Sequence, residues 1–297
     1  MGKKIVRFSG HQTFALRNGW LEKGYAFIKL NNDFSDEAAV VKLGVGKNMV
    51  DSIKYWCEMA GIVRDNKVTG FGEKLLSESL GWDPYLEDLG SWWLLHWKMM
   101  SHNDYSTSGT ALFSGVRKLE FVKNDVVDAA LAMVYDKHKK PSERVVMRDV
   151  DCYLRSYCKP RRRNANAFRE DGFVCPLQEL GLIQAMPENE VYGFAGGWKK
   201  SLPSEVIGYA LSEYFMAANT KVMSIQNVLY QEGSPGQVFM LDEDSLIGAI
   251  KDLQSSQDYR GYFDYSESAG IAIIHCSVPQ GKLTSLLQSY YGEEVVV

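Results

Sequence analysis

The sequence lacks the signatures of several large protein classes. It contains no GxxxxGK[ST] phosphate loop, no GxGxxG fingerprint after a predicted strand and no GxSxG elbow, so it gives no support for nucleotide hydrolysis, dinucleotide binding or acyl hydrolysis. No uninterrupted apolar run reaches about 18 residues, the length expected of a membrane-spanning helix. The five cysteines are an odd number without dense spacing, which argues against a secreted disulfide framework. These absences together predict a soluble protein of the reducing cytoplasm.

The chain also lacks an excess of positive charge. It has 33 basic and 37 acidic residues and a formal net charge of -4. No overall basic field therefore attracts nucleic acid, and any such contact has to come from a local patch. The 297 residues are 45% hydrophobic and 12% aromatic, which is enough material for two or three packed cores.

Residues 36–69 have the pattern of a winged helix-turn-helix. Two amphipathic runs, residues 38–43 and 47–59, are separated by the turn Gly44-Val45-Gly46. The second run places apolar side chains on one helical face (Val50, Ile53, Tyr55, Trp56 and Met59). We expect its polar side chains to face solvent (Lys47, Asn48, Asp51, Ser52 and Lys54).

A short hairpin is predicted directly after this second run. Gly61 ends the helix, Ile62 and Val63 begin a strand, Asp65-Asn66 turns it, and residues 67–69 return. The first turn of a helix that enters a DNA groove attracts anions through its dipole and its basic side chains. The DNA-binding residues predicted here are Lys47, Asn48, Ser52, Lys54 and Lys67. An ordinary helical hairpin without a ligand has the same pattern and stays open.

The whole chain is predicted to be α+β, predominantly helical, with winged helix-turn-helix-like modules in three domains. Residues 1–102 form the first, and they end in an apolar helix over residues 85–100 whose three tryptophans favour a packed core over base stacking. Residues 103–160 form a helical domain, for which a second helix-turn-helix is one interpretation. Residues 161–297 comprise a basic linker and a C-terminal winged-helix-like domain, with a strand expected at 235–241, a helix at 243–253 and a strand at 270–277.

The linker carries the densest basic cluster of the chain. Arg161, Arg162 and Arg163 follow Lys159-Pro160 in a segment poor in apolar residues. Each basic side chain that docks on a phosphate releases condensed counterions, so this cluster is a further DNA-binding candidate. A solvated interdomain linker explains it equally well.

Several blocks resemble a bacterial family long known only as a domain of unknown function. The opening block is residues 8–17, FSGHQTFALR. Later blocks are similar in residues 43–50, 55–57, 83–88, 93–98, 148–155 and 234–239, so the resemblance spans nearly the whole chain. It implies a place beside PAPS-reductase-like sulfur-transfer proteins and cysteine desulfurases in DNA phosphorothioation defence loci. The SspB-type member of this family is regarded as a protein that nicks duplex DNA so that sulfur enters one strand.

If the chain nicks DNA, two groups of residues are candidates for the chemistry. His11 could transfer a proton while Arg17 holds a phosphate through its guanidinium fork. Asp83, Glu87 and Asp88 could instead hold Mg or Mn, which would activate water. Each group has a structural alternative, since His11 can satisfy a buried turn and Asp83-Pro84 can begin a helix. A non-catalytic adaptor and a transcriptional regulator remain alternative functions, in which no cofactor is needed.

Overall fold

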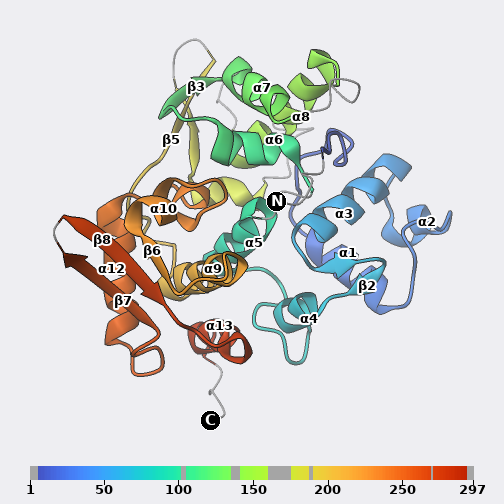
Figure 1. Ribbon diagram of the computed structural model, residues 1–297. Coiled ribbons are helices and arrows are strands. Elements are labelled where there is room, and N and C mark those ends of the chain that lie inside the picture. Colours follow the sequence, from blue (N-terminus) through green and yellow to red (C-terminus); the bar gives the residue numbers. More distant parts are fainter. Residues whose placement is uncertain are drawn as a thin grey trace. The chain divides into compact units, whose positions relative to one another are not determined.

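The computed structural model describes residues 6–101, 105–134, 141–159, 175–186, 190–268 and 270–292 (Figure 1). The chain divides into two compact units, residues 1–195 and 196–297. The domain boundaries predicted from the sequence lie after residues 102 and 160 instead. The structure keeps both segments in one unit because the helix at 89–101 packs on the short helices at 107–110 and 176–180. The class is mixed α+β and mainly helical, as predicted.

The N-terminal part of the first unit contains the predicted helical pair and the short hairpin. Gly44 adopts a left-handed conformation (φ 64°), which ends one helix and redirects the chain into the next. The predicted second helix is confirmed with the same bounds. The elements are α1 (Trp20–Lys29), α2 (Ala39–Leu43), α3 (Lys47–Met59), β1 (Val63–Arg64), β2 (Lys67–Val68) and α4 (Gly70–Leu76).

Helix α3 buries the face that its sequence predicts, with one exception. Its five predicted core side chains are all buried (Val50, Ile53, Tyr55, Trp56 and Met59). The expectation that Ser52 faces solvent is wrong, because this residue is 0% exposed. Its hydroxyl donates to the backbone carbonyl of His11 at 3.1 Å, so a small polar residue sits in the core with its hydrogen bond satisfied.

Helix α5 (Leu89–Ser101) is the central buried helix of the first unit. The tryptophans Trp92, Trp93 and Trp97 are buried, which confirms that they form core rather than a stacking surface. The helix begins four residues later than predicted. Leu86 has a positive φ of 50°, which interrupts a right-handed helix. Asp88 Oδ1 then accepts the N–H of Gly90 at 2.6 Å, in the first turn of α5.

The rest of the first unit is a second set of helices on a three-stranded antiparallel sheet. The sheet order is β3-β5-β4. Helices α7 and α8 pack against each other, and α8 also packs on α6. The elements are α6 (Thr107–Thr110), η1 (Ala111–Gly115), β3 (Glu120–Val122), α7 (Lys123–Ala132), α8 (Glu143–Tyr157), η4 (Pro176–Leu180), β4 (Ile183–Ala185) and β5 (Val191–Phe194).

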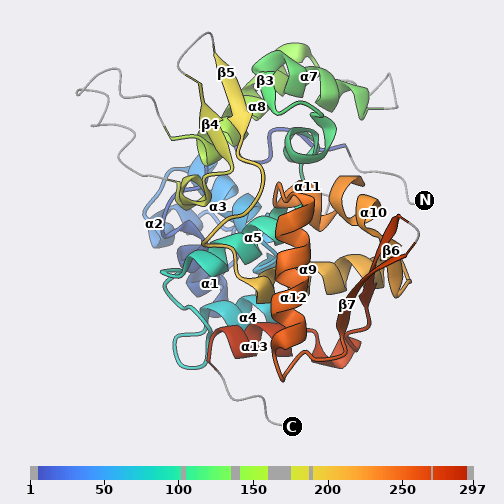
Figure 2. The same cartoon turned by 90° about the vertical axis from the view of Figure 1, so that its left-hand side faces the viewer.

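The second unit also combines helices with a three-stranded antiparallel sheet, in the order β6-β8-β7. Helix α12 packs on α9 and on β7 (Figure 2). Its elements are α9 (Ser204–Ala217), β6 (Val222–Ser224), α10 (Ile225–Tyr230), α11 (Pro235–Val238), α12 (Glu243–Ser255), β7 (Phe263–Ser268), β8 (Ile271–Cys276), η5 (Gln280–Lys282) and α13 (Ser285–Tyr290).

The sequence predictions for this unit are mostly confirmed. The helix expected at 243–253 and the strand expected at 270–277 are present as α12 and β8. The strand expected at 235–241 is wrong, since a short helix, α11, begins there. Ser234 accepts the N–H of Gln237 and Pro235 occupies the first turn, which is a helix start. Over the described ranges, none of the helices is both long and apolar enough to cross a bilayer.

Candidate nucleic-acid interface

The beginning of α3 is exposed to solvent. Lys47 and Asn48 are both exposed in the first turn. The preceding residue, Gly46, is extended (φ -68°, ψ 160°) and offers no side-chain cap. The partial positive charge of the helix N-terminus and the Lys47 ammonium therefore lie together at the surface, where they favour an anionic ligand.

The two lysines of α3 have only weak acidic partners. Lys47 Nζ lies 3.6 Å from Asp51 Oδ1, and the Lys47 side chain is 59% exposed. Lys54 Nζ lies 3.9 Å from Glu58 Oε1 with a side chain 38% exposed. Exposed pairs of this kind are worth about 0–1 kcal/mol. Both ammonium groups can therefore exchange these partners for a phosphate.

The hairpin after α3 adds two further cations. Asp65 and Asn66 have φ values of 50° and 54°, as a tight primed turn requires. This turn pairs Arg64 with Lys67, and both are exposed. Lys67 is among the DNA-binding residues predicted from the sequence, whereas Arg64 is not. The alternation of the strand was the available signal, because buried Val63 places its neighbour on the opposite face.

His11 is not at the surface. It is 1% exposed, and its Nε2 lies 2.7 Å from Asp149 Oδ1 without an aligned hydrogen bond. Its Nδ1 accepts the N–H of Thr13 at 3.0 Å. The same Asp149 oxygen accepts the N–H of Ser9 at 2.6 Å. This arrangement joins the N-terminal segment to helix α8.

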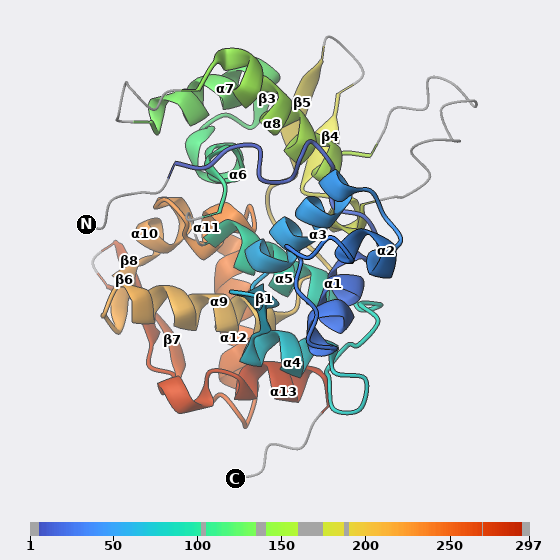
Figure 3. The ribbon, with the colours of Figure 1, turned by 90° about the vertical axis from the view of Figure 1, so that its right-hand side faces the viewer.

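Aromatic rings close around His11. The imidazole stacks on Trp56 at 6.2 Å and meets the edges of Tyr55 and Tyr153 at 5.7 Å and 5.6 Å between ring centroids. The hydroxyls of Tyr55 and Tyr153 are 2.6 Å apart and bridge α3 to α8. Figure 3 shows the N-terminal segment running between α3 and the α7–α8 pair. We call His11, Tyr55, Trp56, Asp149 and Tyr153 the His11 cluster.

The His11 cluster explains much of the opening sequence block without catalysis. A Cβ on Gly10 would lie 2.4 Å from the Tyr55 ring, so only glycine lets the chain pass here. The guanidinium of Arg17 lies over the rings of Phe14 and Trp20 at 5.4 Å and 5.3 Å. A histidine enclosed to this degree has no path to a DNA phosphate. The geometry therefore supports the structural interpretation of His11.

Two carboxylates of the predicted acidic group already accept backbone hydrogen bonds. The two carboxylate oxygens of Asp83 accept the N–H groups of Glu87 and Asp88, each at 3.0 Å. Asp88 Oδ1 is likewise engaged with the N–H of Gly90. Within the described residues, no group of three or more His, Cys, Asp or Glu side chains is arranged to hold a metal ion. The carboxylates of Asp83 and Asp88 order the turn before α5.

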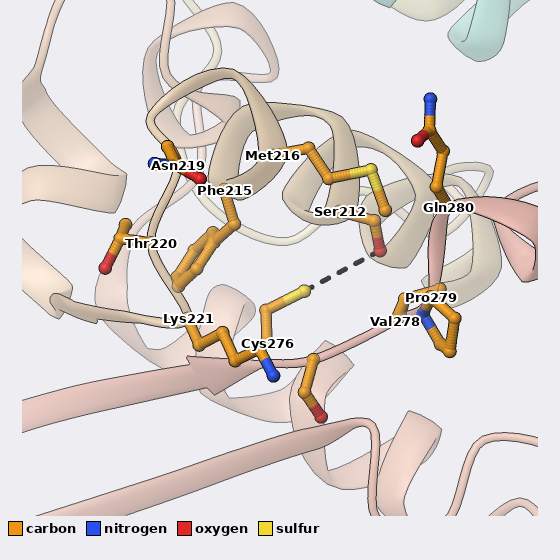
Figure 4. Close-up of a pocket in the computed structure, with 11 residues that line it drawn as sticks. Ser212, Phe215, Met216, Asn219, Thr220, Lys221, Cys276, Val278, Pro279 and Gln280 are labelled. Carbon is orange, nitrogen blue, oxygen red and sulfur yellow. Dashed lines mark hydrogen bonds between the residues drawn. The ribbon is translucent and has the colours of Figure 1, made fainter.

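The five cysteines are buried and form no disulfide within the described residues. Burial raises the pKa of Cys57, Cys152, Cys175 and Cys276 above the ordinary thiol value, so these thiols stay protonated at neutral pH. Cys276 lies at the edge of a cavity of about 630 Å³ in the second unit, where its sulfur is 3.7 Å from the hydroxyl of Ser212 (Figure 4). The wall of this cavity thus offers no thiolate nucleophile. Arg161, Arg162 and Arg163 lie outside the described residues.

Comparisons with known proteins agree with the family resemblance that the sequence blocks indicate. No curated protein matches the chain significantly. Two solved structures are similar over 96% of this chain and 87% of their own: an SspB crystal structure at 30% identity and a magnesium ion-bound SspB crystal structure at 29% identity, each with a TM-score of 0.84. The family model described as a protein of unknown function, DUF4007, matches residues 8–291. The chain therefore belongs to the DUF4007 family.

Proposed function

We propose that this protein is a DNA-binding component of a bacterial DNA phosphorothioation defence system. The observation that carries the proposal is the exposed, cationic beginning of α3 next to the basic hairpin. Lys47, Lys54, Arg64 and Lys67 belong to one short helix-turn-helix segment, which we interpret as a winged helix-turn-helix. In such a module the second helix lies in the major groove and the surrounding cations contact phosphates.

The similarity to SspB supports the phosphorothioation part of the proposal. Its partners would then be duplex DNA, a PAPS-reductase-like sulfur-transfer protein and a cysteine desulfurase of the same system. The exposed polar side chain of Asn48 is suited to a base edge, since an amide can bond adenine through two hydrogen bonds. The lysines and Arg64 supply contacts that do not depend on sequence.

Charge reversal on α3 tests DNA binding directly. We expect Lys47→Glu combined with Lys54→Glu to abolish measurable binding to a duplex, because it replaces two phosphate contacts by two repulsions. The measurement is a fluorescence anisotropy titration with a 30-base-pair duplex over a series of salt concentrations. Lys251→Glu combined with Lys282→Glu is the matched control, since it makes the same charge change at exposed positions of the second unit. Equal affinity of wild type and the α3 variant at low salt would exclude α3 as the binding helix.

A finer proposal is that the protein nicks one strand of duplex DNA with Mg²⁺. It is supported by the similarity to the SspB structure described as magnesium ion-bound. The buried His11 and the engaged Asp83 instead favour a second function, a non-catalytic adaptor that binds DNA and recruits the sulfur-transfer proteins.

A supercoiled plasmid incubated with the purified protein and Mg²⁺ or Mn²⁺ separates these two functions. A nicking enzyme converts the plasmid to the open-circle form, and chelation of the metal stops the conversion. An adaptor binds the plasmid and leaves it supercoiled. Glu87→Gln, at an exposed position, tests the predicted carboxylate group without removing a buried side chain. Nicking that is unaffected by this variant would exclude Glu87 as a metal ligand.

A further inference from the structure

The middle part of the first unit repeats the element order of the second unit. From η1 to β5 the order is helix, strand, two helices and two strands, with the short 3-10 helix η4 inserted before the last two strands. From α9 to β8 the same order recurs, with the short helix α11 inserted between α10 and α12. Both sheets have the order first, third, second strand: β3-β5-β4 and β6-β8-β7. This is the arrangement of a winged helix, in which the second of the two central helices faces the ligand. That helix is α8 in the first unit and α12 in the second.

The exposed face of α8 carries arginines. Arg144, Arg148 and Arg155 are exposed on the helix, while Val146, Val150 and Tyr153 are buried on the other face. Arginines at positions i, i+4 and i+11 fall on one stripe of a helix with 3.6 residues per turn.

Two of these arginines are available to a ligand. Arg155 is engaged, because its Nη2 donates to the carbonyl of Thr13 at 2.7 Å. Over the described ranges, Arg144 and Arg148 form no ion pair with an acidic side chain. The nearby Asp151 already lies 2.5 Å from Lys123 Nζ, so its charge is compensated. Among the residues that the structure describes, the surface at the beginning of α8 therefore keeps two guanidinium groups without an acidic partner.

The corresponding helix of the second unit has the opposite charge. The exposed side chains of α12 include Glu243, Asp244 and Asp252, with Lys251 as the exposed cation. Such a face repels phosphates. The shared element order alone therefore does not predict DNA binding. The exposed arginines indicate α8, and not α12, as the helix suited to phosphates.

We infer that α8 is a second DNA-binding helix, which contacts the phosphates of duplex DNA through Arg144 and Arg148. This inference rests on the proposed DNA-binding function. The hydrogen bond between the Tyr55 and Tyr153 hydroxyls and the His11–Asp149 contact fix α8 to α3 within one unit. Arg148 lies five positions before Tyr153, which is about 140° around the helix. Arg148 thus lies on a different side of α8 from Tyr153, and the unit presents two separate surfaces to DNA.

Removing the two guanidinium groups tests the inference. We expect Arg144→Gln combined with Arg148→Gln to weaken binding to a 60-base-pair duplex about tenfold at moderate salt. The slope of log K against log salt should become shallower by about 1.8, the contribution of two phosphate contacts. Lys251→Gln with Lys282→Gln is the control of equal charge change, and circular dichroism melting confirms that each variant is folded.

The possible outcomes separate this inference from the function on which it rests. A lower affinity with a shallower slope in a folded Arg144→Gln, Arg148→Gln protein whose α3 is unchanged supports a second binding surface on α8. An unchanged affinity and slope in a folded Arg144→Gln, Arg148→Gln protein, together with a loss on changing α3, overturns the α8 inference and leaves the proposed function standing. Wild-type protein that binds no duplex at low salt overturns both.

Discussion

Replacing Asp149 with alanine is expected to lower the free energy of unfolding of the first unit by about 3 kcal/mol. The carboxylate accepts the backbone N–H of Ser9 at 2.6 Å and lies 2.7 Å from His11 Nε2, and its side chain is 1% exposed. The substitution leaves the buried imidazole without its charged neighbour and removes a charge-assisted hydrogen bond. It also opens a cavity among the rings of Tyr55, Trp56 and Tyr153.

Urea denaturation followed by tryptophan fluorescence measures this effect, because Trp56 stacks on the His11 ring. Asp151→Ala, two positions along the same helix, is the matched control. Asp151 is 40% exposed and pairs with Lys123 near the surface, so its removal should cost less than about 1 kcal/mol. Equal destabilisation by the two substitutions would show that the His11 cluster does not hold the N-terminal segment to α8.

The sequence predicted the individual helices and strands of this fold better than it predicted the boundaries between domains. The bounds of α3 follow from Gly44, Gly46 and Gly61, which interrupt a strongly periodic apolar pattern, and such signals lie within a few residues of the element they end. The division of the chain depends on long-range packing instead. The Tyr55–Tyr153 hydrogen bond joins residues 98 positions apart, and no local pattern indicates it.

The candidate site shows the same distinction between local pattern and packing. The exposure of Lys47 and Lys67 and the partial exposure of Lys54 follow from helix and strand periodicity, and the structure agrees. The burial of Ser52 does not, because a serine on the border of the apolar stripe faces either side depending on what packs there. The N-terminal segment, distant in sequence, supplies the carbonyl that Ser52 needs.

The role of His11 could not be predicted from residue type either. Imidazole is equally suited to proton transfer and to a buried polar contact, and the difference depends on access to solvent. That access is closed by Tyr153, which comes from a helix more than a hundred residues later. A choice of catalytic candidates by residue chemistry alone therefore also selects polar side chains whose role is to stabilise the fold.

Gly72→Ala should destabilise the first unit by about 3 kcal/mol and also displace the hairpin that carries Arg64 and Lys67. A Cβ at Gly72 would lie 2.4 Å from the backbone oxygen of Ile62 and 3.0 Å from its Cα. Backbone atoms cannot rotate away as a side chain can. Because Ile62 directly precedes β1, relief of the clash has to move the start of the hairpin away from α4.

Gly70→Ala is the control for this prediction, since no atom lies within 4 Å of a Cβ built at Gly70, which is also in α4. Alanine there should be neutral or should stabilise the protein by up to about 1 kcal/mol, because it is the better helix former. Thermal melting gives the stability of both variants, and the salt series gives their DNA affinity. If the hairpin contacts DNA, Gly72→Ala weakens the affinity for DNA at a temperature where the variant is still folded. Full affinity in the folded variant would mean that Arg64 and Lys67 make no contact with the duplex.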